Sequence, residues 1–205
     1  LDETVTRSNF QVIVGQLDEL AGRKARLEAE REEAETIEIP SQLSNRLSDP
    51  EVSRIVAAEQ KLFEARRSAR HSQRGQLAKR IDQHRNEIIG LRSQLEANSR
   101  ETEIITEELK GVRELYAKQL TSIMRMSSLE RQAAGLTGQK GQLTASIAQT
   151  EGKIAEIGQQ ITQISEDLRA ETQRELREVQ GKIAELSERR AAAHDLLTRV
   201  ELRAP

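Results

Sequence analysis

The stretch Ala117-Lys118-Gln119-Leu120-Thr121-Ser122 decides the fold, because the heptad pattern is out of register on its two sides. Tyr116 and Met126 both occupy seam slots, yet the interval between them is three residues longer than a heptad. Thr and Ser at the end of the stretch can cap a new helix. No Gly or Pro enforces a turn, so a continuous helix could also absorb the break as a stammer. The seams on the two sides are similar in length, which favours a hairpin with its tip at residues 118–122.

The two segments that flank this stretch carry strong coiled-coil patterns. An ascending helix over residues 50–117 has mostly apolar heptad slots from Leu77 onward: Leu77, Ile81, His84, Ile88, Leu91, Leu95, Asn98, Thr102, Ile105, Leu109, Val112 and Tyr116. A descending helix over residues 123–201 begins with these slots: Met126, Leu129, Ala133, Leu136, Lys140, Leu143, Ile147, Thr150, Ile154, Ile157, Ile161, Ile164 and Leu168. Its seam then shifts by one residue, which changes supercoiling without ending a helix. It resumes at Leu176, Val179, Ile183, Leu186, Ala193, Leu197 and Val200.

The first fifty residues predict a shorter helix and an extended connector. A helix fits residues 1–36, with Lys24 and Arg31 in two of its seam slots and apolar residues in the others: Phe10, Ile13, Leu17, Leu20, Leu27 and Ala34. Residues 37–49 break the pattern, because alternating Ile37 and Ile39 followed by Pro40 are typical of extended chain. The sequence Ser48-Asp49-Pro50-Glu51 then offers a side-chain cap and an early proline for the next helix.

The composition favours thin helices over a compact globular domain. The 205 residues include three aromatic ones, Phe10, Phe63 and Tyr116, and 32% are charged. A formal charge of −2 with interleaved acids and bases disfavours nucleic-acid binding. No apolar run approaches the roughly 18 residues that would suggest a membrane span. The predicted fold class is therefore all-α, a long antiparallel coiled-coil hairpin with an additional N-terminal helix packed near its base.

The residue pattern indicates no enzyme, no cofactor and no metal site. His71, His84 and His194 are too scattered for a metal motif, and His84 in a seam slot is interpreted as a tolerated polar core residue. The glycines are dispersed singly, without a phosphate-binding loop, and those at 135, 138 and 141 are interpreted as small exposed helix positions. Carboxylates on a solvated helix face lack the burial that tunes a catalytic acid or base.

Two charge clusters lie apart in the sequence, a basic one over residues 66–85 and an acidic one over residues 28–38. They could dock electrostatically on a neighbouring subunit or an acidic surface. The simpler interpretation, which we favour, is a solvated helix face with weak ion pairs.

Short motifs along the whole chain resemble one family. They are Leu1-Asp2-Glu3-Thr4-Val5, Leu17-Asp18-Glu19-Leu20, Arg26-Leu27-Glu28-Ala29-Glu30-Arg31, Asp49-Pro50-Glu51-Val52, Leu62-Phe63-Glu64-Ala65-Arg66, Arg113-Glu114-Leu115-Tyr116-Ala117-Lys118, Leu129-Glu130-Arg131 and Leu202-Arg203-Ala204-Pro205. Together they resemble the HlyD-type membrane fusion proteins, the periplasmic adaptors of type I secretion. In that family the first and last of these motifs join the helices to a small lipoyl domain. We therefore expect a piece of a larger protein, in which residues 202–205 begin the return to that domain.

The resemblance implies a function and a docking site. Adaptors of this family are anchored in the inner membrane of Gram-negative bacteria, contact an ABC transporter, and meet a TolC-like outer-membrane channel through their tips, usually as a ring of six. Related drug-efflux adaptors use an Arg, a Leu and a Ser at the tip. Leu115 and Ser122 match that pattern, and the Arg position falls on Gly111, so Arg113 or Lys110 could substitute; Gln119 replaces a common tip glycine. The expected partner-binding residues are Arg113, Leu115, Leu120 and Ser122.

The resemblance and the segment lengths also predict how the helices lie. Both chain ends should lie at one base, from which the third helix rises roughly 117 Å and the second, beginning higher, spans roughly 100 Å. The first two helices should then lie parallel and side by side, with residues 37–49 running back between them and anchored by Ile37, Ile39, Leu43 and Leu47. The alternative stacks the first two helices end to end. A different class of protein, a cytoplasmic structural coiled coil with one unbroken helix from about 50 to 200 in a parallel dimer, stays open.

Overall fold

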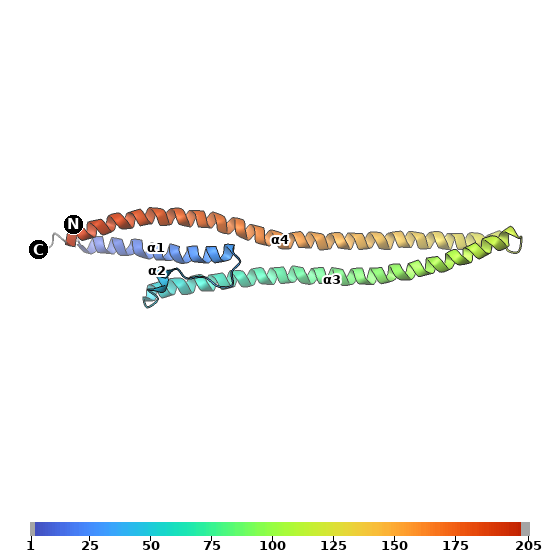
Figure 1. The fold of residues 1–205 in the computed structure, drawn as a ribbon, viewed down its shortest axis with the longest axis horizontal. Coiled ribbons are helices and arrows are strands. Elements are labelled where there is room, and N and C mark those ends of the chain that lie inside the picture. The colour runs from blue at the N-terminus through green and yellow to red at the C-terminus, as the bar shows by residue number, and fades with distance from the viewer. Residues whose placement is uncertain (1–2, 202–205) are drawn as a thin grey trace. The chain divides into compact units, whose positions relative to one another are not determined.

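The computed structural model describes residues 3–201, which form four helices and no β-strand (Figure 1). The helices are α1 (Glu3–Arg31), α2 (Ser41–Ser44), α3 (Pro50–Ala117) and α4 (Ile123–Glu201). The chain divides into two compact units, unit 1 with residues 1–73 and 162–205, and unit 2 with residues 74–161. The predicted all-α hairpin with an additional N-terminal helix is confirmed. The alternative of one unbroken helix from about 50 to 200 is wrong, since α3 ends at Ala117 and α4 begins at Ile123.

Unit 2 is a two-helix antiparallel coiled coil. The predicted seam residues of α3 and α4 are buried or half-buried there, with Ile88, Leu109, Leu129, Leu136 and Ile157 the most enclosed of the apolar ones. Two of the predicted seam residues, Tyr116 and Lys140, are instead exposed. Most positions between the slots are exposed and carry the charges. The seam prediction is therefore confirmed over most of its length, because a two-helix unit can enclose only one stripe of each helix.

Unit 1 contains three long helical segments besides the short α2, and α1 packs against both α3 and α4. Leu27 of α1 is enclosed with Leu176 and Val179 of α4. On another face of α1, Ala21 packs against Val52 and Val56 of α3 together with Leu43 of the connector. Burying each large aliphatic side chain contributes about 1.5–3 kcal/mol.

Ion pairs give the directions of the helices in unit 1. Arg26 bonds Glu59 at 2.5 Å and Glu30 bonds Arg66 at 3.3 Å, so α1 and α3 advance together and are parallel. Arg23 of α1 bonds Glu175 at 2.7 Å, whereas Glu33, just beyond the end of α1, pairs with the earlier α4 residue Arg169 at 3.5 Å, so α1 and α4 run in opposite directions (Figure 1). The predicted side-by-side, parallel arrangement of the first two helices is confirmed, and the end-to-end alternative is wrong.

The connector differs from the fully extended chain that was predicted. It contains the short helix α2 and a turn over residues 45–48, with extended chain before them. Leu43 is fully buried and Ile37 and Ile39 are half-buried, as expected for anchors, but Leu47 is exposed and anchors nothing. The helical turn aims Leu43 towards α1 and α3, which leaves Leu47 on the solvent side.

The first helix ends at Arg31 rather than at residue 36. Glu33 has a left-handed backbone with φ 52°, and the amides of Ala34 and Glu33 donate to the carbonyls of Ala29 (2.9 Å) and Glu30 (3.2 Å). These two bonds form a Schellman motif, which satisfies the last carbonyls of a helix. Such motifs normally place Gly at the left-handed position, so the sequence carries no stop signal here.

Local caps explain where α3 begins and how α4 changes register. Asp49 caps α3, because its Oδ1 accepts the amide of Glu51 at 3.0 Å, and Pro50 takes the first helical position. In α4 the fully buried Thr172 fills the slot after Leu168, so the predicted one-residue seam shift falls between these two residues. Its hydroxyl donates to the carbonyl of Leu168 at 2.8 Å and therefore remains satisfied. The side chain of Val200 and the segment 202–205 lie outside the described residues.

Candidate docking site at the tip

The hairpin tip is built by two helix-end motifs that meet at residues 118–122. At the end of α3, Gln119 has a left-handed backbone with φ 58°. The amides of Leu120 and Gln119 donate to the carbonyls of Leu115 and Tyr116, each at 2.9 Å, in a second Schellman motif. At the start of α4, the amide of Arg125 donates to Ser122 Oγ at 3.4 Å. The hydroxyl of Ser122 therefore caps α4.

Large apolar side chains are exposed around this turn. Leu120 is 71% exposed and Met124 is 78% exposed, and three others are exposed to a smaller extent: Leu115, Tyr116 and Ile123. Hence the structure brings Leu115 and Leu120, which the sequence selected, into one apolar group. We call these five residues the apolar tip cluster.

Sequence reasoning missed three members of the apolar tip cluster. Tyr116 was placed in a seam slot, but it lies in the last turn of α3, directly before the reversal, and its side chain is exposed. Ile123 and Met124 occupy the first turn of α4, before its seam begins at Met126. The sequence did carry one signal for Ile123 and Met124: they are adjacent apolar residues that lie outside the heptad pattern, so burial in the seam does not explain them.

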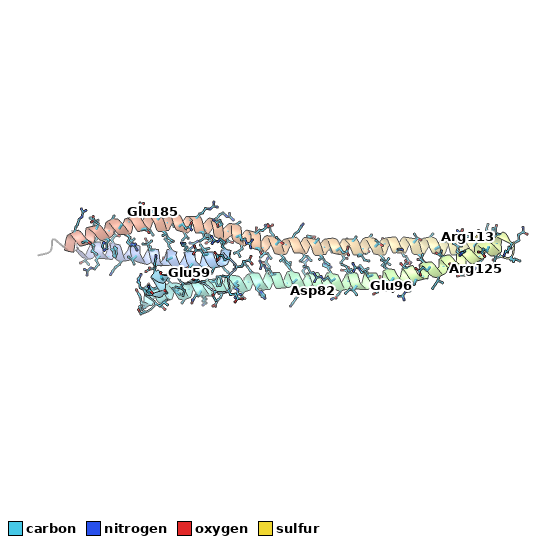
Figure 2. All side chains as sticks on the ribbon, viewed as in Figure 1. Glu59, Asp82, Glu96, Arg113, Arg125 and Glu185 are labelled. Carbon is cyan, nitrogen blue, oxygen red and sulfur yellow. The ribbon has the colours of Figure 1, made fainter. Side chains whose placement is uncertain are left out.

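Arg113 forms an ion pair across the tip. Its Nη2 lies 2.9 Å from Glu130 Oε1 of α4, and Arg125 of α4 pairs with Glu108 of α3 in the opposite sense. Figure 2 shows Arg113 and Arg125 at the same end of unit 2, on different helices. Both pairs are largely solvent-exposed, so each contributes less than about 1 kcal/mol. Arg113 thus joins the two helices beside the apolar tip cluster, and Lys110 pairs only with Glu107 on its own helix, at 4.0 Å.

The two charge clusters of the sequence meet within unit 1. Arg66 Nη1 lies 3.3 Å from Glu30 Oε2, and Arg67 Nη2 lies 4.0 Å from Glu35 Oε1. Glu30 is completely buried, so this pair is not the weak surface contact that the sequence suggested. The physical reason is the parallel packing of α1 on α3, which places Glu30 and Glu35 of the acidic cluster beside the first residues of the basic cluster.

The buried charges of unit 1 shift two pKa values. Burial alone would lower the pKa of Arg26, but hydrogen bonds and charges from Glu59 and Glu30 outweigh it and raise that pKa. The hydrogen bond from Arg23 lowers the pKa of the Glu175 carboxyl. Both shifts favour the charged forms, which is the signature of structural ion pairs rather than of a catalytic acid or base.

No other candidate site competes with the tip in the described part of the chain. Residues 3–201 contain no group of three or more His, Asp or Glu side chains that could hold a metal ion. Unit 1 has an open groove of about 890 Å³ between α1, the connector and α4, lined by small and mixed-charge residues such as Ala21, Lys24, Glu28 and Ile183. Within the described residues, none of the helices has an apolar stretch long enough to cross a bilayer.

The fold places the chain among the all-α proteins built on a long antiparallel helical hairpin, and comparison identifies the family. The family model described as AprE, long alpha-helical hairpin, matches residues 6–196. The chain belongs to this family.

Two known proteins extend this finding. The chain is 41% identical over 205 residues to the type I secretion system membrane fusion protein PrsE of Rhizobium meliloti (strain 1021), covering 100% of this chain and 47% of that protein. It therefore spans about half the length of this curated relative. The crystal structure of the soluble domain of LipC, a membrane fusion protein of a type I secretion system, matches with a TM-score of 0.93 at 20% identity, over 100% of this chain and 96% of that one. This second match shows the fold alone. The predicted resemblance to the hairpin of HlyD-type membrane fusion proteins is confirmed.

Proposed function

We propose that this chain is the non-catalytic hairpin of a periplasmic adaptor in type I protein secretion. In this proposal it belongs to a protein anchored in the inner membrane of a Gram-negative bacterium. Its tip docks on a TolC-like outer-membrane channel, and the rest of the adaptor contacts an ABC transporter and assembles into a ring of about six copies, as the family resemblance implies. The membrane fusion protein named in the sequence comparison supports this role.

The apolar tip cluster is the observation that carries the docking proposal. Five large apolar side chains lie exposed between Leu115 and Met124, where a solvated turn would ordinarily carry polar residues. Burying such side chains in a partner is favourable by about 25 cal/mol for each Å² removed from water. Arg113 and Arg125 are already paired with Glu130 and Glu108 across the tip, so these two cations contribute less to a contact with a partner than the apolar side chains do.

The assigned tip residues have different roles in this proposal. Leu115 and Leu120 bind the channel directly, together with the other members of the apolar tip cluster. Ser122 holds the first turn of α4, and Arg113 holds α3 to Glu130, so both position the cluster. Arg113→Ala should therefore weaken secretion less than a charge placed in the cluster.

Secretion by the full-length protein tests the docking role. We expect Leu115→Asp and Leu120→Asp each to abolish export, while the helix content of the 205-residue chain stays unchanged. Ile104→Asp is a matched control, because Ile104 is also an exposed apolar residue of α3 but lies outside the cluster. Normal export by both tip variants would overturn the docking role, and equal loss in all three variants would show an effect unrelated to the tip.

A further inference from the structure

The turn at residues 118–122 does not by itself fix where the hairpin reverses. Gln119 occupies a left-handed position that favours Gly, and no Pro is present in the turn. If α3 and α4 slipped past each other by one heptad, the turn would move along the chain and other residues would form the tip. Something in unit 2 must therefore oppose such a slip.

Three flanking ion pairs define the register of the seam. Arg92 pairs with Glu151 and Arg113 with Glu130, and the intervals 92 to 113 and 130 to 151 are equal, as an antiparallel coiled coil requires. Arg125 and Glu108 form the equivalent contact on the opposite side of the seam. In this register the slots face each other as follows: Val112 with Met126, Leu109 with Leu129, Ile105 with Ala133, Thr102 with Leu136, Asn98 with Lys140, Leu95 with Leu143, Leu91 with Ile147, Ile88 with Thr150, His84 with Ile154, Ile81 with Ile157, and Leu77 with Ile161.

One layer of this seam is polar on both sides. Asn98 and Lys140 share it, whereas every other layer from Leu77–Ile161 to Val112–Met126 has an apolar residue on at least one helix. Asn98 is only 7% exposed and donates to Gln139 Oε1 at 3.2 Å. Its Oδ1 is buried without a hydrogen-bond partner among the described residues. Lys140 is exposed, so its ammonium keeps its water while the layer remains polar.

A slip of one heptad in either direction would separate these two residues. In one direction Asn98 would face Ile147 and Lys140 would face Ile105. In the other direction Asn98 would face Ala133 and Lys140 would face Leu91. Each slipped register thus places two polar groups in two apolar layers, and a buried polar group without a partner is costly.

We propose that the Asn98–Lys140 layer specifies the register of the hairpin and thereby positions the tip at residues 118–122. A single polar pair in an apolar seam is known to select one register at some loss of stability. By fixing the register, the layer keeps residues 115–124 at the reversal of the chain. The turn residues themselves would also allow the reversal to occur elsewhere. Its importance for docking rests on the proposed function, but the register itself can be measured without any partner.

Engineered thiol pairs report the register, because the 205-residue chain contains no cysteine. Thr106→Cys with Thr137→Cys places thiols at positions equivalent to the Arg113–Glu130 pair and reports the native register. Thr106→Cys with Thr144→Cys reports a slip of one heptad in one direction, and Ser99→Cys with Thr137→Cys reports a slip in the other. All four positions lie outside the seam slots.

The test compares disulfide formation of these pairs in different layer variants. In the parent chain only the native pair should form. In Asn98→Leu/Lys140→Leu, formation of at least one slipped pair should rise about tenfold or more, which corresponds to about 1.4 kcal/mol in the register equilibrium. The exchanged variant Asn98→Lys/Lys140→Asn keeps one Asn and one Lys in the layer and should behave as the parent does.

A second control separates register from general seam stability. His84→Leu/Thr150→Leu adds apolar volume to two layers that are polar on one side only, so it should leave the slipped pairs as rare as in the parent. The proposal is overturned if the double Leu variant at 98 and 140 forms no more slipped disulfide than this control. It is also overturned if the exchanged variant slips as the double Leu variant does.

Discussion

Unit 1 and unit 2 use the same two long helices but bury different chemistry. In unit 2 the buried polar residues are neutral, Asn98 and Thr150, and the charges lie outside the seam. In unit 1 the buried polar residues include the ionised side chains of Asp18, Arg26 and Glu30. The third helical segment makes the difference, since α1 has neighbours on two faces and cannot turn all its charges to water.

The difference between the units shows that the number of helices packed around a charged side chain determines how much hydration it loses. An ion pair beside a two-helix seam keeps most of its hydration and contributes little. Arg26 and Glu30, at 2% and 0% exposed, have lost their water and depend on each other and on Glu59 and Arg66. Removing one member of such a network destabilises the protein, even where the net contribution of the whole network to stability is small.

The largest expected effect breaks this network in unit 1. Glu30→Ala leaves Arg26 buried with only Glu59 and removes the partner of Arg66, so it should reduce the free energy of unfolding by about 3 kcal/mol. Glu96→Ala in unit 2 removes only an exposed pair with Arg100, and should cost less than about 0.5 kcal/mol. Urea denaturation followed by circular dichroism measures both. Equal midpoints for the two variants would contradict the contrast between the units.

The next effect concerns the connector, which only unit 1 possesses. Leu43→Ala should cost about 2–3 kcal/mol, because Leu43 is fully enclosed with Val52 and Val56. It should also speed proteolytic cleavage within residues 32–49. Leu47→Ala, four residues away but exposed, should change stability by less than about 0.5 kcal/mol and leave cleavage unchanged. Faster cleavage in the Leu47 variant would show that this residue does anchor the connector.

Each unit has a non-glycine residue with a left-handed backbone at the end of a helix, Glu33 in unit 1 and Gln119 in unit 2. Substitution of each by Gly compares the backbone strain at the two positions. Gln119→Gly should stabilise the hairpin by about 0.5–1 kcal/mol, since relief of the backbone strain exceeds the entropy that Gly loses. Glu33→Gly should gain less, because it also removes the 3.5 Å pair with Arg169. Thermal unfolding of the two variants measures the difference. A larger gain for the Glu33 variant would mean that this ion pair contributes nothing.

The smallest expected effect is a pH dependence. The pKa of Glu175 is lowered in the folded state by Arg23, so this pair contributes stability above the ordinary carboxyl pKa. That contribution is lost as the pH falls through the lowered folded pKa. Glu175→Gln should cost about 0.5 kcal/mol at neutral pH and should reduce the loss of stability in acid. The exposed Glu185–Arg189 pair serves as control: Glu185→Gln should reduce the free energy of unfolding at neutral pH by less than Glu175→Gln does.

The sequence could predict what depends on one helix and its nearest seam. Heptad spacing identified the buried residues of α3 and α4, and the broken register between Tyr116 and Met126 located the tip. The segment lengths, once both ends were assigned to one base, required α1 beside α3. These features follow from periodicity and from the fixed rise of an α-helix.

The candidate site was predictable only in part. Leu115 and Leu120 were selected as partner-binding residues from the family resemblance, and the side chains of both are exposed. Tyr116 was assigned to the seam, because a heptad pattern does not show at which residue the seam ends before a turn. The ion pair of Arg113 depends on Glu130 of the other helix, which no spacing rule identifies, whereas the capping role of Ser122 follows from its place at the start of the predicted helix.

The heptad pattern was therefore sufficient to predict the all-α class, the hairpin and the row of buried residues along each of the helices α3 and α4. Tertiary structure alone decided the end of α1 at Arg31, the turn of α2, and the burial of Glu30 against Arg66. The physical reason is that periodicity records which face of a helix is apolar, whereas the left-handed backbone of Glu33 has no Gly to announce it and the buried charge of Glu30 depends on a partner from elsewhere in the chain.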